Sequence, residues 1–576
     1  MAVHTNFALA PLRCRAMGSI SRLLRCGTVS ALLAAAPVAW AQEPSAEPSA
    51  NPSASPPAVP TRESLEESHA TIRSIHITVD NVFDPNNPDE NKALYRWANK
   101  VHVLTREKVI QDMLLFAPGD VFDARLIDES ARALRAGGFI ADAVVEPANY
   151  DPATNSVDVN VKLRDSWSLA LEAKLNRKGG QTEWGIGLSD SNLLGTGKTL
   201  QVGYESEIDR DQALLGYSDP NVFGSRVRLR ALFSNASDGH RRELNVERPF
   251  FSLYTRWSAG GRLHDEERVD TIYDLGEEID EFEHEIEASA VQGGWSPGAV
   301  DNSAQRWLFG FAKEEHKFFP TPEVPNTLLL PPDRKLVYPW IGWQWLVDDY
   351  REMTELNDMG RTEDVSLGFN LFASVGFAER RFGSDRDATL FELTAAKGWE
   401  PGPPGGLLLI DGGASTRRED TGNVNTQVYF NGHYYRRNLG RHLFSVSLAA
   451  LATDALDPEK QVLLGGDNGL RGYPIRYQAG ENRAVVNVEQ RFFTDLYPWR
   501  LLRIGWAVFA DVGKVSGRDP RTSAPLGTLY DVGAGLRLTS PRASGRNVVH
   551  VDLAFPLNGP ASIDSVQFVI ETKGSF

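Results

Sequence analysis

The larger, carboxyl-terminal part of the chain alternates apolar and polar residues with a period of two. From Ser166 onward, such segments repeat between turns of Gly, Pro, Asn and Asp. In Val548–Phe555 every second residue from Val549 is apolar, whereas His550 and Asp552 fall on the other face. This alternation is typical of a β-strand with one apolar and one polar face. A chain of many such strands forms either a soluble sandwich or a closed transmembrane barrel.

Three observations favour the barrel. The segments are about 10 residues long, which is enough to cross a bilayer when a strand is tilted. The sequence contains no apolar stretch long enough for a membrane-spanning helix. The chain also begins with an export signal, described next. We therefore predict an all-β transmembrane barrel over residues 166–576. The overall hydrophobic content of 41% fits one-faced strands, because half of each strand stays polar.

The first 41 residues have the pattern of a secretory signal peptide. Basic residues without any acid precede the apolar run Gly27–Trp40, which ends in a small-x-small cleavage pattern before Gln42. The only two cysteines, Cys14 and Cys26, lie in this segment. We therefore exclude disulfides and a cysteine-ligated metal site from residues 42–576. The net charge of −16 argues against a nucleic-acid partner.

Between the signal and the strand-rich region we predict a tether and a small mixed domain. Residues 42–71 begin with a run of Pro, Ser and Ala that is typical of a disordered tether. Residues 72–165 carry helical periodicity, with Thr105 and Asp123 expected as N-caps of two helices. A strand precedes these helices and two strands follow them, so the order is β-α-α-β-β. The resulting sheet has an edge that can accept a further strand.

A glycine-rich segment with one arginine interrupts the alternation at Gly465–Tyr473. Its four glycines allow unusual backbone angles and close packing, so the segment is not a strand. The next two alternating segments place Glu489 and Asp511 on their polar faces. A buried guanidinium requires carboxylate partners. We therefore predict that Arg471, on the loop between strands, pairs with both acids.

Several motifs together resemble the outer membrane protein 85 superfamily. The amino-terminal domain resembles a POTRA domain, both in its β-α-α-β-β order and in the wording of residues 129–140. Residues 189–198 and 217–225 look like the first barrel hairpins of that family. The remaining matches are the loop motif Leu470, Arg471, Gly472 and Tyr473, the strand motif Phe509, Asp511 and Gly513, and the terminal-strand signal Phe568, Ile570 and Phe576.

The resemblance implies a particular architecture and location. One POTRA-like periplasmic domain (72–165) precedes a barrel in the cell outer membrane, which marks a short, single-POTRA subtype. The loop over residues 465–480 folds into the barrel, and its arginine pairs with Glu489 and Asp511 on the wall. The family barrel has about 16 strands. Counting alternating segments gives up to about 20, and both numbers stay open at this stage.

The resemblance also implies an assembly or translocation function without a chemical step. The expected partners are a client polypeptide, outer-membrane lipid and lipopolysaccharide, and the cell's own barrel assembly machinery, which inserts this chain. The client is received at the POTRA-like sheet edge and passes a weak seam between the first strand, near Leu169–Leu175, and the last, near Val566–Gly574. A secretion pore dedicated to one exoprotein and a passive porin remain alternatives.

The sequence contains no pattern that indicates an enzyme active site, a cofactor site or a metal site. No nucleophile constellation appears, and the eleven histidines lack ligand spacing. One charged feature stands out, because residues 265–287 contain twelve acids in 23 positions. We interpret this segment as a solvated loop or strand rim, with divalent-cation binding near lipopolysaccharide as the alternative.

Overall fold

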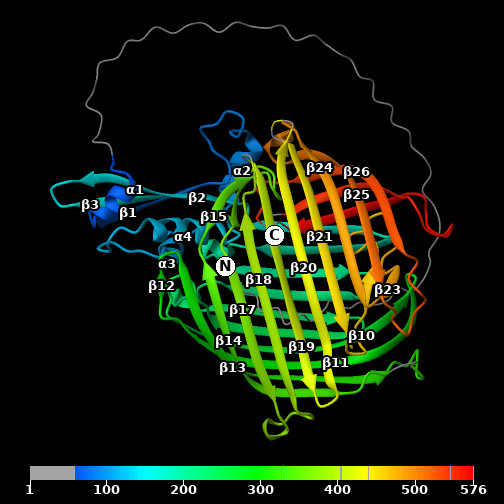
Figure 1. The fold of residues 1–576 in the computed structure, drawn as a ribbon. Helices are drawn as coiled ribbons and strands as arrows, with labels where there is room; N and C mark the ends of the chain where they lie inside the picture. The colour runs from blue at the N-terminus through cyan, green and yellow to red at the C-terminus, as the bar shows by residue number, and fades with distance from the viewer. Residues whose placement is uncertain are drawn as a thin grey trace, which may run out of the picture.

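The computed structural model describes residues 59–574 except 328–329, 403–404, 439, 441 and 545–546. A small amino-terminal domain sits against one end of a large barrel (Figure 1). The predicted signal peptide, most of the predicted tether and Phe576 lie outside the described residues. Within the described ranges, no helix is both long and apolar enough to cross a membrane.

The amino-terminal domain packs helices on a three-stranded sheet of order β1-β3-β2. Its core is apolar and fully enclosed, with Ile110, Leu134 and Val159 at 0% exposure. Its elements are α1 (Arg62–Glu67), β1 (Thr71–Asp80), α2 (Ala93–Val101), α3 (Glu107–Met113), α4 (Ala124–Arg135), β2 (Ile140–Asp151) and β3 (Ser156–Asp165).

Two local predictions in this domain differ from the structure. Helix α1 lies inside the segment predicted as tether, and Leu65 is fully buried in the core, so the fold begins before Ile72. Thr105 does not cap α3, because its hydroxyl donates to Asp165 Oδ1 at 2.8 Å. Asp123 does cap α4, since its side chain accepts from the N–H groups of the first helical turn.

Most of the remaining described chain forms a closed antiparallel barrel of 20 strands, to which the two-residue strand β12 (Ala299–Val300) adds a short pairing with β13. Figure 1 shows the barrel wall. The segment count was therefore right, and the expectation of about 16 strands from the family resemblance was wrong. The barrel strands are β4 (Leu169–Lys178), β5 (Gln181–Asp190), β6 (Thr199–Ser206), β7 (Asp211–Asp219), β8 (Arg228–Ala236), β9 (Gly239–Arg248), β10 (Trp257–Asp274), β11 (Glu277–Trp295), β13 (Ser303–Pro320), β14 (Arg334–Val347), β17 (Asn370–Ala378), β18 (Ala388–Trp399), β19 (Gly406–Glu419), β20 (Gly422–Asn438), β21 (His442–Asp454), β24 (Asn482–Phe493), β25 (Arg503–Ser516), β26 (Thr528–Thr539), β27 (Asn547–Pro556) and β28 (Gln567–Gly574).

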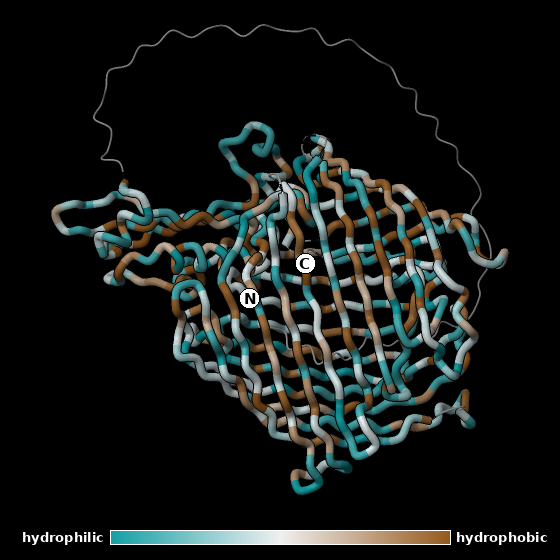
Figure 2. Tube along the Cα trace, in the orientation of Figure 1, coloured by the Kyte–Doolittle hydropathy of each residue, from teal (hydrophilic) through white to brown (hydrophobic). Residues whose placement is uncertain are grey.

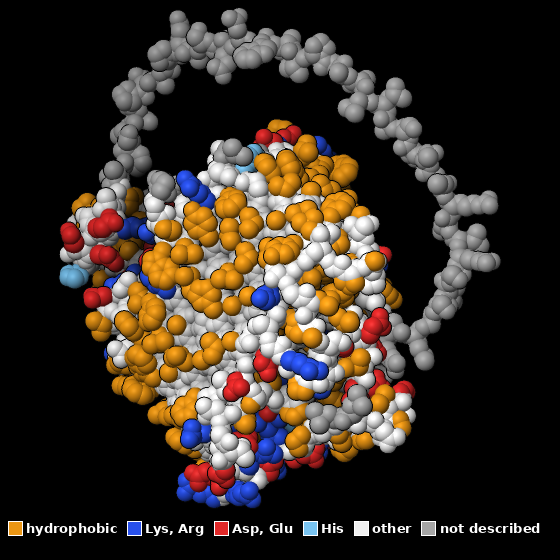
Figure 3. All heavy atoms as spheres, turned by 45° about the vertical axis from the view of Figure 1, so that its right-hand side comes forward, with side chains coloured by type: hydrophobic (Ala, Val, Ile, Leu, Met, Phe, Trp, Pro, Cys, Tyr) orange, Lys and Arg blue, Asp and Glu red, His pale blue; other side chains and the backbone are white. Residues whose placement is uncertain are grey.

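The alternation read from the sequence separates the inside of the barrel from the outside. On β27, Leu553 and Phe555 are exposed, whereas Asp552 and Ala554 are buried. Figure 2 shows apolar and polar residues alternating along the strands, and Figure 3 shows apolar side chains over much of the wall that faces the viewer. An apolar outer face of this kind is typical of a barrel whose wall contacts lipid.

The acidic segment 265–287 forms the far part of the long β10–β11 hairpin. Its acids are partly neutralised by neighbours on the same strand pair and on the adjoining strand. Arg268 Nε donates to Asp270 Oδ1 at 2.7 Å, and Lys313 Nζ lies 2.7 Å from Glu287 Oε2. The segment therefore lies in two long strands, as one form of the sequence interpretation expected, but it is not solvated throughout, because Asp270 is 0% exposed.

The amino-terminal domain docks on the barrel through two similar turns. These are the early-hairpin segments 189–198 and 217–225, which contain η1 (Leu193–Gly195) and η2 (Val222–Gly224). Gly195 O accepts from Arg106 N at 2.9 Å, and Arg226 Nη1 donates to Met113 O at 3.2 Å. We call this end the near mouth of the barrel and the opposite end the far mouth.

The seam between the first and last strands is weakly paired. Antiparallel pairing of β28 with β4 is recorded for one residue pair only, Ile570 and Arg177. Lys178 Nζ lies 2.7 Å from Glu571 Oε1 and adds an ion pair beside it. The seam therefore lies between the first and the last strand, as predicted, and the residue pair is at the far end of β4.

Candidate functional site: an arginine loop inside the barrel

A loop between β21 and β24 folds into the barrel from the far mouth. It contains β22 (Val462–Leu464) and β23 (Gln478–Gly480), and it spans the predicted segment 465–480. Leu470 and Tyr473 are fully buried, and Arg471 is 7% exposed. Gly465 allows the loop to close on itself, because a Cβ there would lie 2.4 Å from Pro474 O.

Arg471 is held by both carboxylates that the sequence assigned to it. Its Nε and Nη2 donate to the two oxygens of Asp511 at 2.7 and 2.8 Å, which is a bidentate pair. Its Nη1 donates to Glu489 Oε2 at 3.1 Å. Asp511 is 0% exposed, so this pair is shielded from water and from salt.

The other two positions of the strand motif also contact the loop. The guanidinium of Arg471 stacks on the ring of Phe509, and Arg471 Cζ lies 3.3 Å from the centroid of that ring. Gly513 leaves room for Leu470, since a Cβ at this glycine would lie 2.9 Å from Leu470 Cδ1. Each of the three motif positions on β25 therefore has its own contact with the loop.

Gly472 and Tyr473 extend the contact to β26 and to the turn after β27. Gly472 N donates to Asp531 Oδ2 at 3.0 Å, and a Cβ at Gly472 would lie 2.6 Å from Asp531 Cβ. Tyr473 Oη lies 2.7 Å from Asn558 Oδ1 and 2.8 Å from Tyr530 O. The loop tip is thus fixed on the inner face of β24 to β27.

Sequence reasoning missed part of this network. Asp552 accepts from Arg471 Nη1 at 3.1 Å and from Arg537 Nη1 at 2.5 Å. Arg537 Nη2 donates to Glu489 Oε2 at 2.8 Å, and Arg491 Nε donates to Glu489 Oε1 at 2.7 Å. The alternation had placed Asp552 on an inward face, and that was the one available signal.

The terminal-strand residues divide between two environments. Phe568 is exposed on the outer wall, and Ile570 forms the single seam pair with Arg177. Phe576 is not among the described residues. The proposed role of these three residues as an assembly signal stays a prediction.

A second charged cluster joins the amino-terminal domain to the barrel at the near mouth. It contacts a hairpin of β15 (Tyr350–Thr354) and β16 (Thr362–Ser366), which lies between β14 and β17. Arg135 of α4 donates to Asp364 Oδ2 at 2.8 Å and to Glu352 Oε1 at 2.7 Å. Arg132 Nη2 donates to Asp348 Oδ2 at 2.9 Å. Helix α4 therefore forms ion pairs with both strands of this hairpin.

A carboxyl group with a shifted pKa lies beside this cluster. Glu129 of α4 accepts from Leu253 N at 3.0 Å. Burial, with a smaller contribution from the nearby Asp348 carboxylate, raises the pKa of Glu129 from 4.5 to about 7. The docking of α4 therefore contains a group that titrates near neutral pH.

The two edges of the amino-terminal sheet differ in their availability. On the β2 edge, Ala143 O accepts from Arg135 Nη1 at 2.9 Å and Val145 O accepts from Arg62 Nη2 at 3.1 Å. On the β1 edge, residues 74–80 have no backbone hydrogen bond on the side away from β3 within the described chain. The β1 edge is thus the one open to an added strand.

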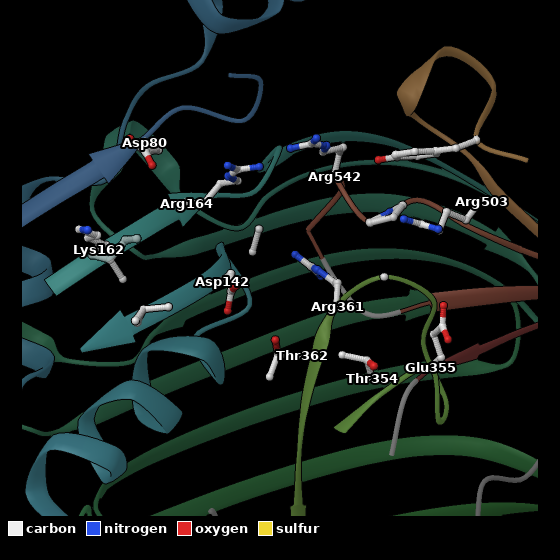
Figure 4. A pocket seen from close by; sticks show the side chains of 16 residues that line it. Asp80, Asp142, Lys162, Arg164, Thr354, Glu355, Arg361, Thr362, Arg503 and Arg542 are labelled. Atoms are coloured by element: carbon white, nitrogen blue, oxygen red, sulfur yellow. The ribbon is translucent and has the colours of Figure 1, made fainter. Parts of the chain in front are cut away.

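A cleft of about 610 Å³ lies where the domain, the hairpin and the barrel rim meet (Figure 4). Lys162 and Arg164 enter it from β3, Arg361 from the hairpin loop and Arg503 from the barrel rim. Three acids also line the cleft: Asp80, Asp142 and Glu355. Basic side chains therefore outnumber acidic ones at this entrance to the barrel.

A comparison with protein families identifies the amino-terminal domain. Residues 102–165 match the family model of POTRA, described as a surface antigen variable number repeat. A search of curated proteins finds no match. The POTRA match and the closed barrel together support the resemblance to the outer membrane protein 85 superfamily.

Solved structures to which this chain is similar include one BamA and two CdiB proteins. BamA from Haemophilus ducreyi lacking POTRA domains 1–3 is 13% identical, with 88% of this chain and 84% of that chain covered and a TM-score of 0.38. CdiB from Escherichia coli is 14% identical, with 88% and 76% covered and a TM-score of 0.46. CdiB from Acinetobacter baumannii is 12% identical, with 88% and 73% covered and a TM-score of 0.43.

Proposed function

We propose that this chain is an outer-membrane factor that inserts a client polypeptide into the membrane or moves it across. The observation that carries the proposal is a POTRA domain docked on a closed barrel whose seam has one recorded residue pair, Ile570 with Arg177. A POTRA domain at the near mouth can receive a client before it reaches the barrel. A weak seam can open at low energetic cost, since few hydrogen bonds are broken. No chemical step is required.

The client is received as an added strand at the edge of β1. An extended peptide pairs with free backbone groups at a sheet edge, and the backbone bonds do not depend on client sequence. The β2 edge is less suited, because arginine side chains already occupy the carbonyls of Ala143 and Val145. This assignment sharpens the expectation of an open edge from the sequence.

The arginine loop keeps the barrel wall rigid while the seam moves. Its tip joins four consecutive strands, β24 to β27, through charged and backbone contacts. These strands adjoin β28, the last strand of the seam. A rigid block of this kind confines opening to the β4–β28 junction.

Site-specific photocrosslinking tests the reception step. A photoreactive residue at the exposed Thr78 of β1 should crosslink to envelope proteins in transit. The same residue at the exposed Val144 of β2 is the matched control and should crosslink much less. Equal crosslinking from both edges, or none from Thr78, would contradict the proposal.

A secretion pore for one partner protein is the second candidate. The presence of a single POTRA match, at residues 102–165, favours it slightly. A large exoprotein encoded beside this chain would support that candidate. A passive porin is the third, and it predicts a large steady conductance that is unchanged when residues 72–165 are deleted.

A further inference from the structure

A second segment enters the barrel, this time from the near mouth. The loop Glu355–Arg361 connects β15 to β16 and turns inward against the wall of β19 to β27. Leu356 is 5% exposed and Met359 is 4% exposed. Their apolar surroundings are Val365, Leu367, Leu407, Tyr435, Leu443, Phe493 and Val548. We call Glu355–Arg361 the plug.

The barrel wall offers polar groups that match the backbone and side chains of the plug. Arg491 Nη1 donates to Leu356 O at 2.7 Å. Tyr435 Oη donates to Asn357 Oδ1 at 3.2 Å, and Arg437 Nη2 donates to Thr354 O, immediately before the plug. Two of these three bonds reach main-chain carbonyls, which every polypeptide presents.

The plug is folded by its own hairpin and not by the wall. The buried carboxylate of Glu363 accepts from the N–H groups of Leu356 and Asn357 at 2.8 and 3.0 Å. The wall supplies donors to the carbonyls of the plug, while the hairpin satisfies its N–H groups. The plug can therefore leave the wall as a folded unit, without exposing its own amides.

We propose that this part of the inner wall is a polypeptide-binding site that the plug occupies in cis. An extended client segment takes the same site when the plug leaves, with apolar residues in the pocket of Leu356 and Met359 and its carbonyls on Arg437 and Arg491. This inference rests on the proposed function for the identity of the client. The site itself rests on the contacts of the plug.

Helix α4 connects this site to the POTRA domain. Arg135 is 5% exposed and bridges Glu352 and Asp364 on the two strands that carry the plug. Arg135 Nη1 also donates to the backbone carbonyl of Ala143, on the edge strand β2. Because Arg135 binds both strands of the hairpin, a movement of the POTRA domain relative to the barrel displaces the hairpin and the plug with it. The basic cleft of Figure 4 adjoins the plug at Gly360 and Arg361.

Conductance in planar bilayers tests whether the plug closes the near mouth. We would replace Glu355–Arg361 with seven Gly and Ser residues in the full chain. The expected result is a steady conductance several-fold above that of the unmodified barrel. The same type of replacement at Pro322–Thr327, a loop at the far mouth, is the control and should change little. An unchanged conductance in the plug variant would overturn the inference.

A peptide added in trans tests the binding site itself. The probe is a synthetic peptide with the sequence of Glu355–Arg361, applied to the plug-replaced barrel from the near side. It should lower the conductance at a concentration at least tenfold below that needed by a peptide with aspartate at the Leu356 and Met359 positions. Equal potency of the two peptides, or no block by either, would overturn the inference. These readouts need no client, so they can fail while the proposed function stands.

A crosslink tests whether the client needs the site. Asp358 and Thr539 are joined by a 3.2 Å hydrogen bond, and no native cysteine follows Cys26. A cleavable bismaleimide between cysteines introduced at these positions should stop the transfer of the envelope proteins captured at β1. Cleaving the linker should restore it. Undiminished transfer with the linker intact would overturn the claim that the client takes this site.

Discussion

The barrel holds two inward segments, one at each mouth, and they are stabilised in different ways. The loop tip at Arg471 is fixed by a bidentate carboxylate pair and two further acids, all of them buried. The plug is fixed by an apolar pocket and hydrogen bonds to the wall, with Arg135 as its ionic link to the POTRA domain. The ion pair between the plug and the wall, Glu355 with Arg437 at 3.6 Å, is partly exposed, whereas the charges around Arg471 are buried and costly to separate. We therefore expect the loop to stay in place and the plug to be the segment that moves.

The largest effect is expected at the loop. Arg471→Ala leaves Asp511 and Asp552 buried without a cationic partner from the loop, which should lower barrel stability by about 3–5 kcal/mol. Urea unfolding followed by heat-modifiability on gels measures it. Arg381→Ala, at an exposed turn of the far mouth, should have no effect. Normal stability of the Arg471 variant would remove the distinction between the two segments.

A smaller effect is expected in the plug. Leu356→Ala removes a buried side chain and should destabilise the plug locally by about 2–5 kcal/mol, without unfolding the barrel. Hydrogen exchange should accelerate in residues 350–366 and stay unchanged in β24 to β27. Phe223→Ala is the control, because Phe223 is 98% exposed. Global unfolding of the Leu356 variant would show that the plug is structural and not mobile.

A still smaller effect is expected when the ion pairs between α4 and the hairpin are removed. Arg135→Ala removes the charge-assisted hydrogen bonds to Asp364. The free energy of docking the amino-terminal domain on the barrel should become less favourable by about 1–3 kcal/mol. We expect faster exchange in the hairpin and a higher frequency of open events in conductance traces. Arg62→Ala alters the same domain but touches no residue of the hairpin, so it should leave both readouts unchanged. Identical behaviour of the two variants would argue against a link.

The smallest effect concerns pH. The pKa of Glu129 is raised from 4.5 to about 7 in the docked state. Its contribution to docking is therefore complete below about pH 4.5 and is lost as pH rises through about 7. Exchange rates at the α4 interface should rise between pH 6 and 8 by a modest factor. Glu129→Gln should remove that dependence, and persistence of the pH effect in this variant would assign it to another group.

Much of the loop could be predicted from the sequence, because its signals are local. The strand alternation decides which residues face inward, so it suffices to identify Glu489 and Asp511 as wall residues. A lone arginine among glycines then has few possible partners. The same alternation placed Asp552 inside, yet nothing in its neighbourhood says that its partners are Arg471 and Arg537.

The plug could not be predicted from the sequence, because the residues that hold it lie far from it along the chain. Residues 350–366 show no period-two alternation that would mark an inward face, and Leu356 and Met359 belong to no motif. The plug is held by contacts with Tyr435, Arg491 and Thr539, which lie 78 to 181 positions away in the sequence from the plug residues they bind. The β2 edge shows the same limit, since its blocking by Arg62 and Arg135 depends on how the helices pack.

The sequence by itself determined the two-part architecture, the orientation of each strand and the identity of the loop arginine. Period-two alternation is a property of neighbouring residues, so it survives in the unfolded chain and can be read directly. Only the tertiary structure decided the number of strands, which sheet edge is open and that the hairpin of β15 and β16 turns into the near mouth. These depend on pairings between residues tens to hundreds of positions apart, which the burial of apolar surface and buried charge selects only during folding.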